Sequence, residues 1–302
     1  MINYDLCLAW NWEYDSDFVK LLDCACQSKR LSLLYITPDN LKNILDSLDN
    51  NRITFKVFFD RASDTDKRFI LVDQWAHNHS VYRINARERA SRSWNKATMH
   101  LNLINAGVHT PYTIIIPSYE EQPDLTPIDL SSLGDSFFIK PAHGSGGEGV
   151  KKDSNSFNQV LIARQEHPAD IYLLQARIFP VQLDTRPAWF RIIYCEGQVY
   201  LSWWDIHTHI YTPVTPEEEE QYTLSPLRSI SASIARLCGL ELFSTEIALT
   251  PDSLFVVVDY VNDQIDLRIQ SKTLDGVPDD IVCNIVERLV DLVALNITRS
   301  RM

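Results

Sequence analysis

An apolar run that ends in a lysine and continues directly into a glycine-rich loop constrains this chain more than any other segment. The segment from Phe137 to Val150 reads Phe-Phe-Ile-Lys-Pro-Ala-His-Gly-Ser-Gly-Gly-Glu-Gly-Val. Glycines allow positive φ and a close approach of the backbone to a ligand, and successive N–H groups in such a turn point at an anion. Because Lys140 adds a positive charge at the strand end, the segment predicts a clamp over the phosphates of a nucleotide.

The same loop satisfies a rival pattern, the G-x-G-x-x-G dinucleotide fingerprint. That pattern requires a preceding strand and a helix that opens after it, whereas residues 150–156 are polar and lack a helical period. The P-loop is excluded because Val150 follows Gly149, and the protein-kinase loop because Lys151 replaces its valine. An ordinary glycine turn between two strands remains the alternative to the clamp.

Composition excludes several classes of protein. A net charge of −12 argues against a nucleic-acid partner, which would require a basic face. No apolar run reaches the length of a membrane span, and the N-terminus lacks the basic start of a signal peptide. The six cysteines are scattered and are expected to be reduced thiols, so we expect a cytoplasmic protein.

The order of predicted elements indicates an α/β fold that becomes α+β in its C-terminal part. In the first third, strands alternate with helices, which predicts a mostly parallel sheet. The last third predicts an antiparallel hairpin over 190–204, strands at 243–250 and 255–261, and a closing amphipathic helix over 279–296. At 302 residues the chain can form one large core or two to three small ones. We expect three units: 1–92, 93–178 and 179–302.

Two carboxylates and an amide lie on the two predicted C-terminal strands. Glu246 interrupts an apolar strand, and Asp259 and Asn262 follow the run Phe255-Val-Val-Val. A carboxylate at the end of such a run needs a partner, because burial of an unpaired charge is costly. Hard oxygen ligands of this kind suit Mg²⁺ beside phosphate oxygens. The alternative is that Asp259 and Asn262 shape a turn and Glu246 pairs with an arginine.

The order of these features resembles the ATP-grasp ligases, notably the ribosomal-protein glutamate ligases, glutathione synthetase and, more distantly, D-alanine–D-alanine ligase. The resemblance covers residues 95–262, and the preceding βαβ unit fits the N-terminal pre-ATP-grasp domain. Asn95-Lys96-Ala-Thr-Met-His-Leu resembles the opening lysine helix of the family, and Ala106-Gly107-Val108-His-Thr-Pro111-Tyr-Thr113 its strand entry. The expected architecture is therefore ATP-grasp.

The resemblance implies roles for individual residues. Nucleotide binding falls on the lysines, the loop and the adenine hinge: Lys96, Lys140, Gly144, Ser145, Gly146, Gly147, Gly149, Gln175, Ala176, Arg177 and Ile178. Arg191 matches the arginine of the acyl-transfer centre, with Lys140 as its catalytic companion. Glu246, Asp259 and Asn262 match the metal ligands, so the implied cofactors are ATP and Mg²⁺, two ions being expected and Mn²⁺ an alternative.

Three positions depart from the family pattern. Ala176 stands where the hinge often has a glutamate, and Trp189 stands where an acid usually precedes the arginine by two residues. Asp184 is a candidate to replace that acid at the ribose. The pair Asp259-Tyr-Val-Asn262 is one residue longer than the usual Glu-x-Asn, which a β-bulge could absorb.

The implied function is an ATP- and Mg²⁺-dependent carboxylate–amine ligase that forms an amide through an acyl phosphate. A small-molecule kinase and a nucleotide-binding protein without turnover are the alternatives. The expected substrates are a small-molecule or peptide carboxylate and an amine. Arg61, at a predicted strand end, and Arg268, after the metal strand, are candidates to hold a substrate carboxylate, with an ion pair at the surface as the alternative for Arg61. A homodimer is left open.

Overall fold

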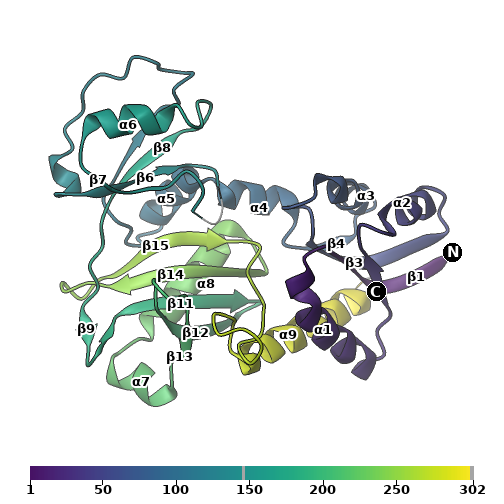
Figure 1. Cartoon of the computed structure of the whole chain (residues 1–302). Helices are drawn as coiled ribbons and strands as arrows, with labels where there is room; N and C mark the ends of the chain where they lie inside the picture. The colour runs from purple at the N-terminus through teal and green to yellow at the C-terminus, as the bar shows by residue number, and fades with distance from the viewer. Residues whose placement is uncertain (145–146, 300–302) are drawn as a thin grey trace.

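The computed structural model describes residues 1–144 and 147–299. Its strands form a parallel sheet at the N-terminus, two antiparallel sheets further along the chain and a short two-stranded ribbon (Figure 1). The two larger antiparallel sheets face each other in Figure 1, and the parallel sheet lies to one side with its own helices. The predicted α/β class, with an antiparallel C-terminal part, is confirmed.

The N-terminal sheet has strand order β2-β1-β3-β4, and every pairing is parallel. Its central strands are apolar runs buried on both faces, as in sheets covered by helices on both sides. The strands are β1 (Ile2–Trp10), β2 (Leu33–Ile36), β3 (Ile53–Arg61) and β4 (Tyr82–Ile84). The covering helices are α1 (Ser16–Ser28), α2 (Leu41–Asp49) and α3 (Ile70–Asn78).

Two helices lead into the middle of the chain, α4 (Arg87–Trp94) and α5 (Lys96–Asn105). The sequence predicts one helix from Ser93 to Asn105, but the structure has two helices that are separated at Asn95. This residue is extended, and its side-chain oxygen accepts a hydrogen bond from the N–H of Thr98 at 2.8 Å, which caps α5. The proposed boundary between residues 92 and 93 falls inside α4.

The middle sheet has the order β5-β8-β6-β7, with all strands antiparallel. The helix beside it starts at a capping box formed by Ser156 and Gln159. The strands are β5 (Thr113–Ile116), β6 (Phe137–Pro141), β7 (Lys151–Ser154) and β8 (Tyr172–Ala176), and the helix is α6 (Phe157–Arg164).

The C-terminal sheet has the order β13-β12-β11-β14-β15 and is antiparallel throughout. Its strands are β11 (Trp189–Cys195), β12 (Gln198–Trp204), β13 (Tyr211–Pro213), β14 (Leu242–Leu249) and β15 (Phe255–Asn262). The ribbon β9 (Gln182–Leu183) and β10 (Arg186–Pro187) precedes it. Helices α7 (Pro216–Gln221) and α8 (Pro226–Cys238) follow β13, and α8 ends at the left-handed Gly239.

The closing helix α9 (Asp279–Arg299) joins the two ends of the molecule. In Figure 1 it runs from the C-terminal sheet to the N-terminal sheet. Its apolar residues share one core with β1, α1 and β11, to which Leu6, Phe18, Ile193 and Leu289 belong. The first and last parts of the chain therefore bury apolar surface against each other. No helix among the described residues is long and apolar enough to cross a membrane.

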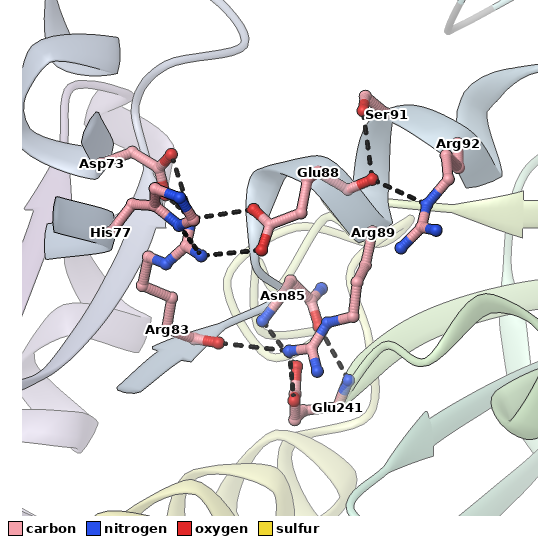
Figure 2. A network of polar contacts seen from close by, with 9 residues as sticks. All are labelled: Asp73, His77, Arg83, Asn85, Glu88, Arg89, Ser91, Arg92 and Glu241. Atoms are coloured by element: carbon pink, nitrogen blue, oxygen red, sulfur yellow. Dashed lines mark hydrogen bonds and ion pairs between the residues drawn. The ribbon is translucent and has the colours of Figure 1, made fainter. Parts of the chain in front are cut away.

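A polar network fixes the start of α4 to the C-terminal sheet (Figure 2). The carboxylate of Glu241 accepts hydrogen bonds from the backbone N–H of Asn85 at 2.7 Å and from Arg89 Nη2 at 2.6 Å. Arg83 forms ion pairs with Asp73 of α3 and Glu88 of α4. Because Glu241 is buried, these contacts hold α4 and the N-terminal sheet in a defined position.

Candidate nucleotide and metal site

Three charged side chains form one row across the C-terminal sheet. Arg191 of β11 lies directly opposite Glu246 of β14, and Glu246 lies directly opposite Asp259 of β15. Directly opposite residues in an antiparallel sheet place their side chains on the same face, with Cβ atoms about 5 Å apart. The structure thus brings Arg191 together with two of the three residues predicted to bind a metal.

A bulge between β14 and β15 brings in the third predicted ligand. Ser244 pairs with Asn262 while Glu246 pairs with Asp259, so the register shifts between these pairs. Three steps along β15 match two along β14, which absorbs the extra residue of Asp259-Tyr-Val-Asn262. The amide of Asn262 donates a hydrogen bond to Asp259 Oδ2 at 2.9 Å. The three predicted ligands are therefore neighbours in the strand pair.

Glu246 is held by two donors from β11. Arg191 forms an ion pair with one carboxylate oxygen, and the indole N–H of Trp189 donates to the other at 3.1 Å. Arg191 also donates from Nη2 to Ser244 Oγ at 3.0 Å. Trp189 occupies the position where an acid was expected, and it orients Glu246 instead. The spacing of two residues between Trp189 and Arg191 was the available signal, because such residues share a face.

The charge of Arg191 is stabilised by its surroundings. Burial opposes the charged form, but Tyr211, Glu246 and Asp259 outweigh it and raise the pKa of the guanidinium. Its Nε atom is buried and makes no hydrogen bond to the residues described here. A buried donor without a partner is costly, so Nε is suited to an acceptor supplied by a ligand.

Both predicted nucleotide lysines lie beside this row. Burial lowers the pKa of Lys140, and the positive charge of Lys96 lowers it further. The negative charges of Asp259 and Glu246 act in the opposite direction and raise it. Burial also lowers the pKa of Lys96, against the attraction of Asp259 and Asp170. Because the charge of Asp259 raises the pKa of both ammonium groups, the lysines of the middle part of the chain lie within electrostatic reach of the carboxylates of the C-terminal sheet.

The lysines are also fixed to each other through the end of β6. The backbone N–H of Lys96 donates to the carbonyl of Ala142 at 2.8 Å, and Lys96 Nζ donates to the carbonyl of Gly144 at 2.6 Å. Lys140 Nζ donates to the side-chain oxygen of Gln175 at 2.6 Å. Two half-buried cations beside two carboxylates are a set of groups suited to a phosphate and a divalent cation.

The glycine loop joins two antiparallel strands, β6 and β7. Gly144, Gly147 and Gly149 have φ values of 133°, 79° and 70°. A Cβ on Gly149 would lie 2.8 Å from His167 Nε2, so that side chain would have to shift, and the positive φ favours glycine there in any case. A glycine turn between two strands is the alternative to a phosphate clamp, and the observed connection has that topology. The same topology is equally compatible with a clamp. Ser145 and Gly146 lie outside the described residues.

The predicted hinge begins at the end of β8. The side chain of Gln175 is buried and bonds within the protein, and the N–H of Ala176 donates to the carbonyl of Tyr112 at 2.9 Å. Arg177 pairs with Asp153, and Ile178 follows in irregular structure. Adenine recognition at this hinge would therefore fall on backbone groups other than the N–H of Ala176.

Asp184 lies in the turn between β9 and β10, where φ is 53°. Its carboxylate accepts a hydrogen bond from the hydroxyl of Tyr222, just beyond α7. This contact gives Asp184 a structural partner, and its proposed role at a ribose stays a prediction.

Arg61 forms its ion pair inside the protein and not at the surface. The Arg61 side chain is 3% exposed, and Nε and Nη2 donate to both oxygens of Asp15 at 2.7 Å. Nη2 also donates to the carbonyl of Ile265 at 3.1 Å. The alternative of a surface ion pair is wrong in this respect, and a guanidinium held in this way is not open to a substrate carboxylate.

Arg268 is held more loosely than Arg61. It pairs with Asp266 and Asp275, and the hydrogen bond to Asp266 is the main cause of a raised pKa. Its side chain is partly exposed and lies over the ring of Trp12 at 5.9 Å. Its Nη1 binds neither carboxylate and donates to Thr273 Oγ1 at 3.4 Å, so Arg268 stays a candidate.

Two pockets on the described part of the surface are lined by residues other than Glu246 and Asp259. One, of about 510 Å³, adjoins the glycine loop at Gly144, His167 and Asp170. The other, of about 470 Å³, lies beside the Arg83 network of Figure 2 and contains charged groups that already pair with one another. We therefore place the site by the chemistry of the facing lysines and carboxylates.

No group of three or more histidine, cysteine, aspartate or glutamate side chains among the described residues could hold a metal. The candidate site has two such carboxylates and completes its ligand set with the amide of Asn262. This composition suits Mg²⁺, which takes one or two carboxylates and fills its shell with water and phosphate oxygens.

No protein-family model matches the sequence, and no curated protein matches it. Solved structures do match. The RimK domain ATP-grasp protein of Sphaerobacter thermophilus DSM 20745 is 16% identical, with a TM-score of 0.64 over 95% of this chain and 99% of that one. The D-alanine–D-alanine ligase of Bacillus anthracis, solved with ATP, is 11% identical, with a TM-score of 0.65 over 100% and 99%.

The ATP-grasp ligase PsnB, solved with precursor peptide PsnA2 and AMPPNP, is 13% identical, with a TM-score of 0.60 over 98% of each chain. At such identities the likeness establishes the fold and not the activity. In these three matches at least 95% of this chain and 98% of the other chain are covered, so the likeness extends over nearly the whole chain. This chain therefore has the ATP-grasp fold.

Proposed function

We propose that this protein is an ATP- and Mg²⁺-dependent carboxylate–amine ligase that forms an amide through an acyl phosphate. The observation that carries the proposal is the row Arg191, Glu246 and Asp259, which lies within electrostatic reach of Lys96 and Lys140. Cations suited to phosphate, carboxylates suited to a metal and an arginine suited to a reacting carbonyl lie near one another, which supports the proposal. The ligases with the same fold support the proposal at the level of the reaction class.

The two lysines would neutralise charge on the transferring phosphoryl group. Glu246, Asp259 and Asn262 would hold Mg²⁺, which supplies positive charge to the phosphate oxygens when bound. The glycine loop would contribute backbone N–H groups and close over the site, and the segment around 175–178 would meet the base. Exclusion of water by this closure protects an acyl phosphate from hydrolysis.

Arg191 would stabilise the oxyanion that develops when an amine attacks the activated carboxyl. Its Nε is buried and has no hydrogen-bond partner among the described residues, and its charge is held by Glu246 and Asp259. Arg268, partly exposed, is our candidate for holding a substrate carboxylate. The acid and amine are expected to be small molecules or peptides, as for PsnB with its precursor peptide.

The test is a screen of amino acids and short peptides against amines with ATP and Mg²⁺, with hydroxylamine as a second acceptor. We expect phosphate release that depends on the acid, and a hydroxamate when hydroxylamine replaces the amine. Asp259→Asn is the control and should abolish both. ADP without inorganic phosphate, together with a phosphorylated product, would show a kinase instead.

A nucleotide-binding protein without turnover is the second candidate. It is favoured by one observation: Glu246 is already held by Arg191 and by Trp189, which replaces the expected acid. These donors compete with a metal for the carboxylate. MgATP binding without phosphate release across the whole screen would support this second function. The variant Trp189→Asp would then test whether the tryptophan at this position prevents turnover.

A further inference from the structure

A chain of hydrogen bonds leads from Lys140 into the interior. Lys140 Nζ donates to Gln175 Oε1 at 2.6 Å, and Gln175 Nε2 donates to the hydroxyl of Tyr260 at 2.8 Å. The hydroxyl of Tyr260 lies 2.7 Å from His100 Nδ1. Gln175, Tyr260 and His100 are 1%, 4% and 3% exposed, so little of this chain contacts solvent.

The surroundings of Gln175 fix the orientation of its amide. The hydroxyl of Thr113 donates to the carbonyl of Pro111 at 2.9 Å, so its oxygen is left to accept a hydrogen bond from Gln175 Nε2 at 3.2 Å. Burial lowers the pKa of His100, which keeps the ring neutral and leaves Nδ1 able to accept from Tyr260. Both neighbours of the NH₂ group are therefore acceptors, and the amide must turn its oxygen toward Lys140.

This series of hydrogen bonds connects the elements that carry the proposed site. Lys140 and Gln175 lie on β6 and β8, Tyr260 lies on β15 beside Asp259, and His100 lies on α5, one helical turn after Lys96. A single buried path thus joins the middle sheet, the C-terminal sheet and the helix that carries the second lysine. Tyr260 is one of the two residues between Asp259 and Asn262, where this chain is one residue longer than the pattern it resembles.

We propose that Tyr260 and His100 are positioning residues that hold Lys140 toward the phosphates through the oriented amide of Gln175. The proposal rests on the proposed nucleotide site. Without the Tyr260 hydroxyl, one N–H of Gln175 loses its acceptor and the amide is free to flip. A flipped amide presents an NH₂ group to an ammonium group, so Lys140 loses its partner.

Tyr260→Phe tests the proposal, and Tyr172→Phe is the matched control. Tyr172 is also buried, and its hydroxyl donates to the carbonyl of Ala163 at 2.7 Å, so its variant loses a comparable hydrogen bond that does not reach Lys140. A second pair compares His100→Asn, which retains an acceptor near the position of Nδ1, with His100→Leu, which does not.

The first measurement uses the ligand-free protein. Competitive acetylation of Lys140, followed by peptide mass spectrometry, should become several-fold faster in Tyr260→Phe and His100→Leu. It should stay unchanged in Tyr172→Phe and close to wild type in His100→Asn. Equal rates in Tyr260→Phe and wild type would overturn the proposal, as would equal increases in both tyrosine variants.

The second measurement is the dissociation constant of MgATP by calorimetry. We expect it to rise roughly tenfold in Tyr260→Phe and to stay within about twofold in Tyr172→Phe, even where both lose similar thermal stability. An unchanged constant in Tyr260→Phe would contradict the proposal. If wild type bound no MgATP while acetylation changed as expected, the proposed function would fail and the positioning of Lys140 would stand.

Discussion

Arg191 is the residue at which the stability of the site and its proposed chemistry meet. Its guanidinium binds Glu246 and Ser244, and it lies over the ring of Trp204 at 5.2 Å. Because Glu246 is also a proposed metal ligand, the arginine and the metal share one carboxylate. An arginine suits this position since its planar fork can bind two acceptors at once.

Arg191→Lys should lower kcat by about 10²–10³-fold, since a lysine keeps the charge but cannot reproduce the fork. The measurement is steady-state turnover with an acid and amine pair from the screen. Arg228→Lys is the matched control, because Arg228 binds both oxygens of Glu219 on the surface. Equal turnover in Arg191→Lys and wild type would remove Arg191 from the chemistry.

His100 should make stability depend on pH. Burial lowers its pKa below the ordinary value of 6.5, so the unfolded chain takes up a proton before the native one. This contribution to stability is therefore complete above that value and is lost as pH falls through it, until native His100 is also protonated. Urea unfolding between pH 7 and 5 should show a smaller loss of stability in His100→Asn than in wild type. Identical pH dependence would contradict the buried neutral ring.

At the scale of elements, the features that depend on local sequence patterns could be predicted, and those that depend on distant contacts could not. The lysine strand, the glycine loop and the acidic strands were predictable because apolar runs and glycines act locally. The helix break at Asn95 was missed because one capping hydrogen bond decides it. The partners of Arg61 and Gln175 were not predictable, since Asp15 and Tyr260 lie 46 and 85 residues away.

Asn95→Ala should lower stability by about 1 kcal/mol and also weaken MgATP binding, because the lost cap frees the first turn of α5, which carries Lys96. The measurements are urea unfolding and calorimetry. Thr215→Ala removes a comparable cap from α7, away from the lysines, and should cost stability alone. Equal MgATP affinity in both variants would separate Asn95 from the positioning of Lys96.

At the scale of the whole molecule, the two ends of the chain are joined by a shared core and by a buried ion pair. Arg61 links β3 to Asp15, at the start of α1, and to the carbonyl of Ile265 just after β15. The N-terminal sheet is thereby fixed against the segment that follows the proposed metal ligands. Movements of one part relative to the other would have to break this contact.

Arg61→Met should lower the free energy of unfolding by about 3–5 kcal/mol, because it leaves the carboxylate of Asp15 buried without a partner. Adding Asp15→Leu should recover much of that loss. Urea unfolding of the single and double variants measures both effects. An unchanged stability with a raised KM for the acid would instead restore Arg61 as a substrate ligand.

The most direct measurement of the central claim is the affinity for ATP with and without Mg²⁺, by calorimetry, in wild type and in Asp259→Asn. The account predicts that Mg²⁺ strengthens ATP binding to wild type and that this gain disappears in Asp259→Asn. Equal affinities of wild type with and without Mg²⁺, or no ATP binding at all, would contradict a triphosphate held between the two lysines and a metal on the last two strands.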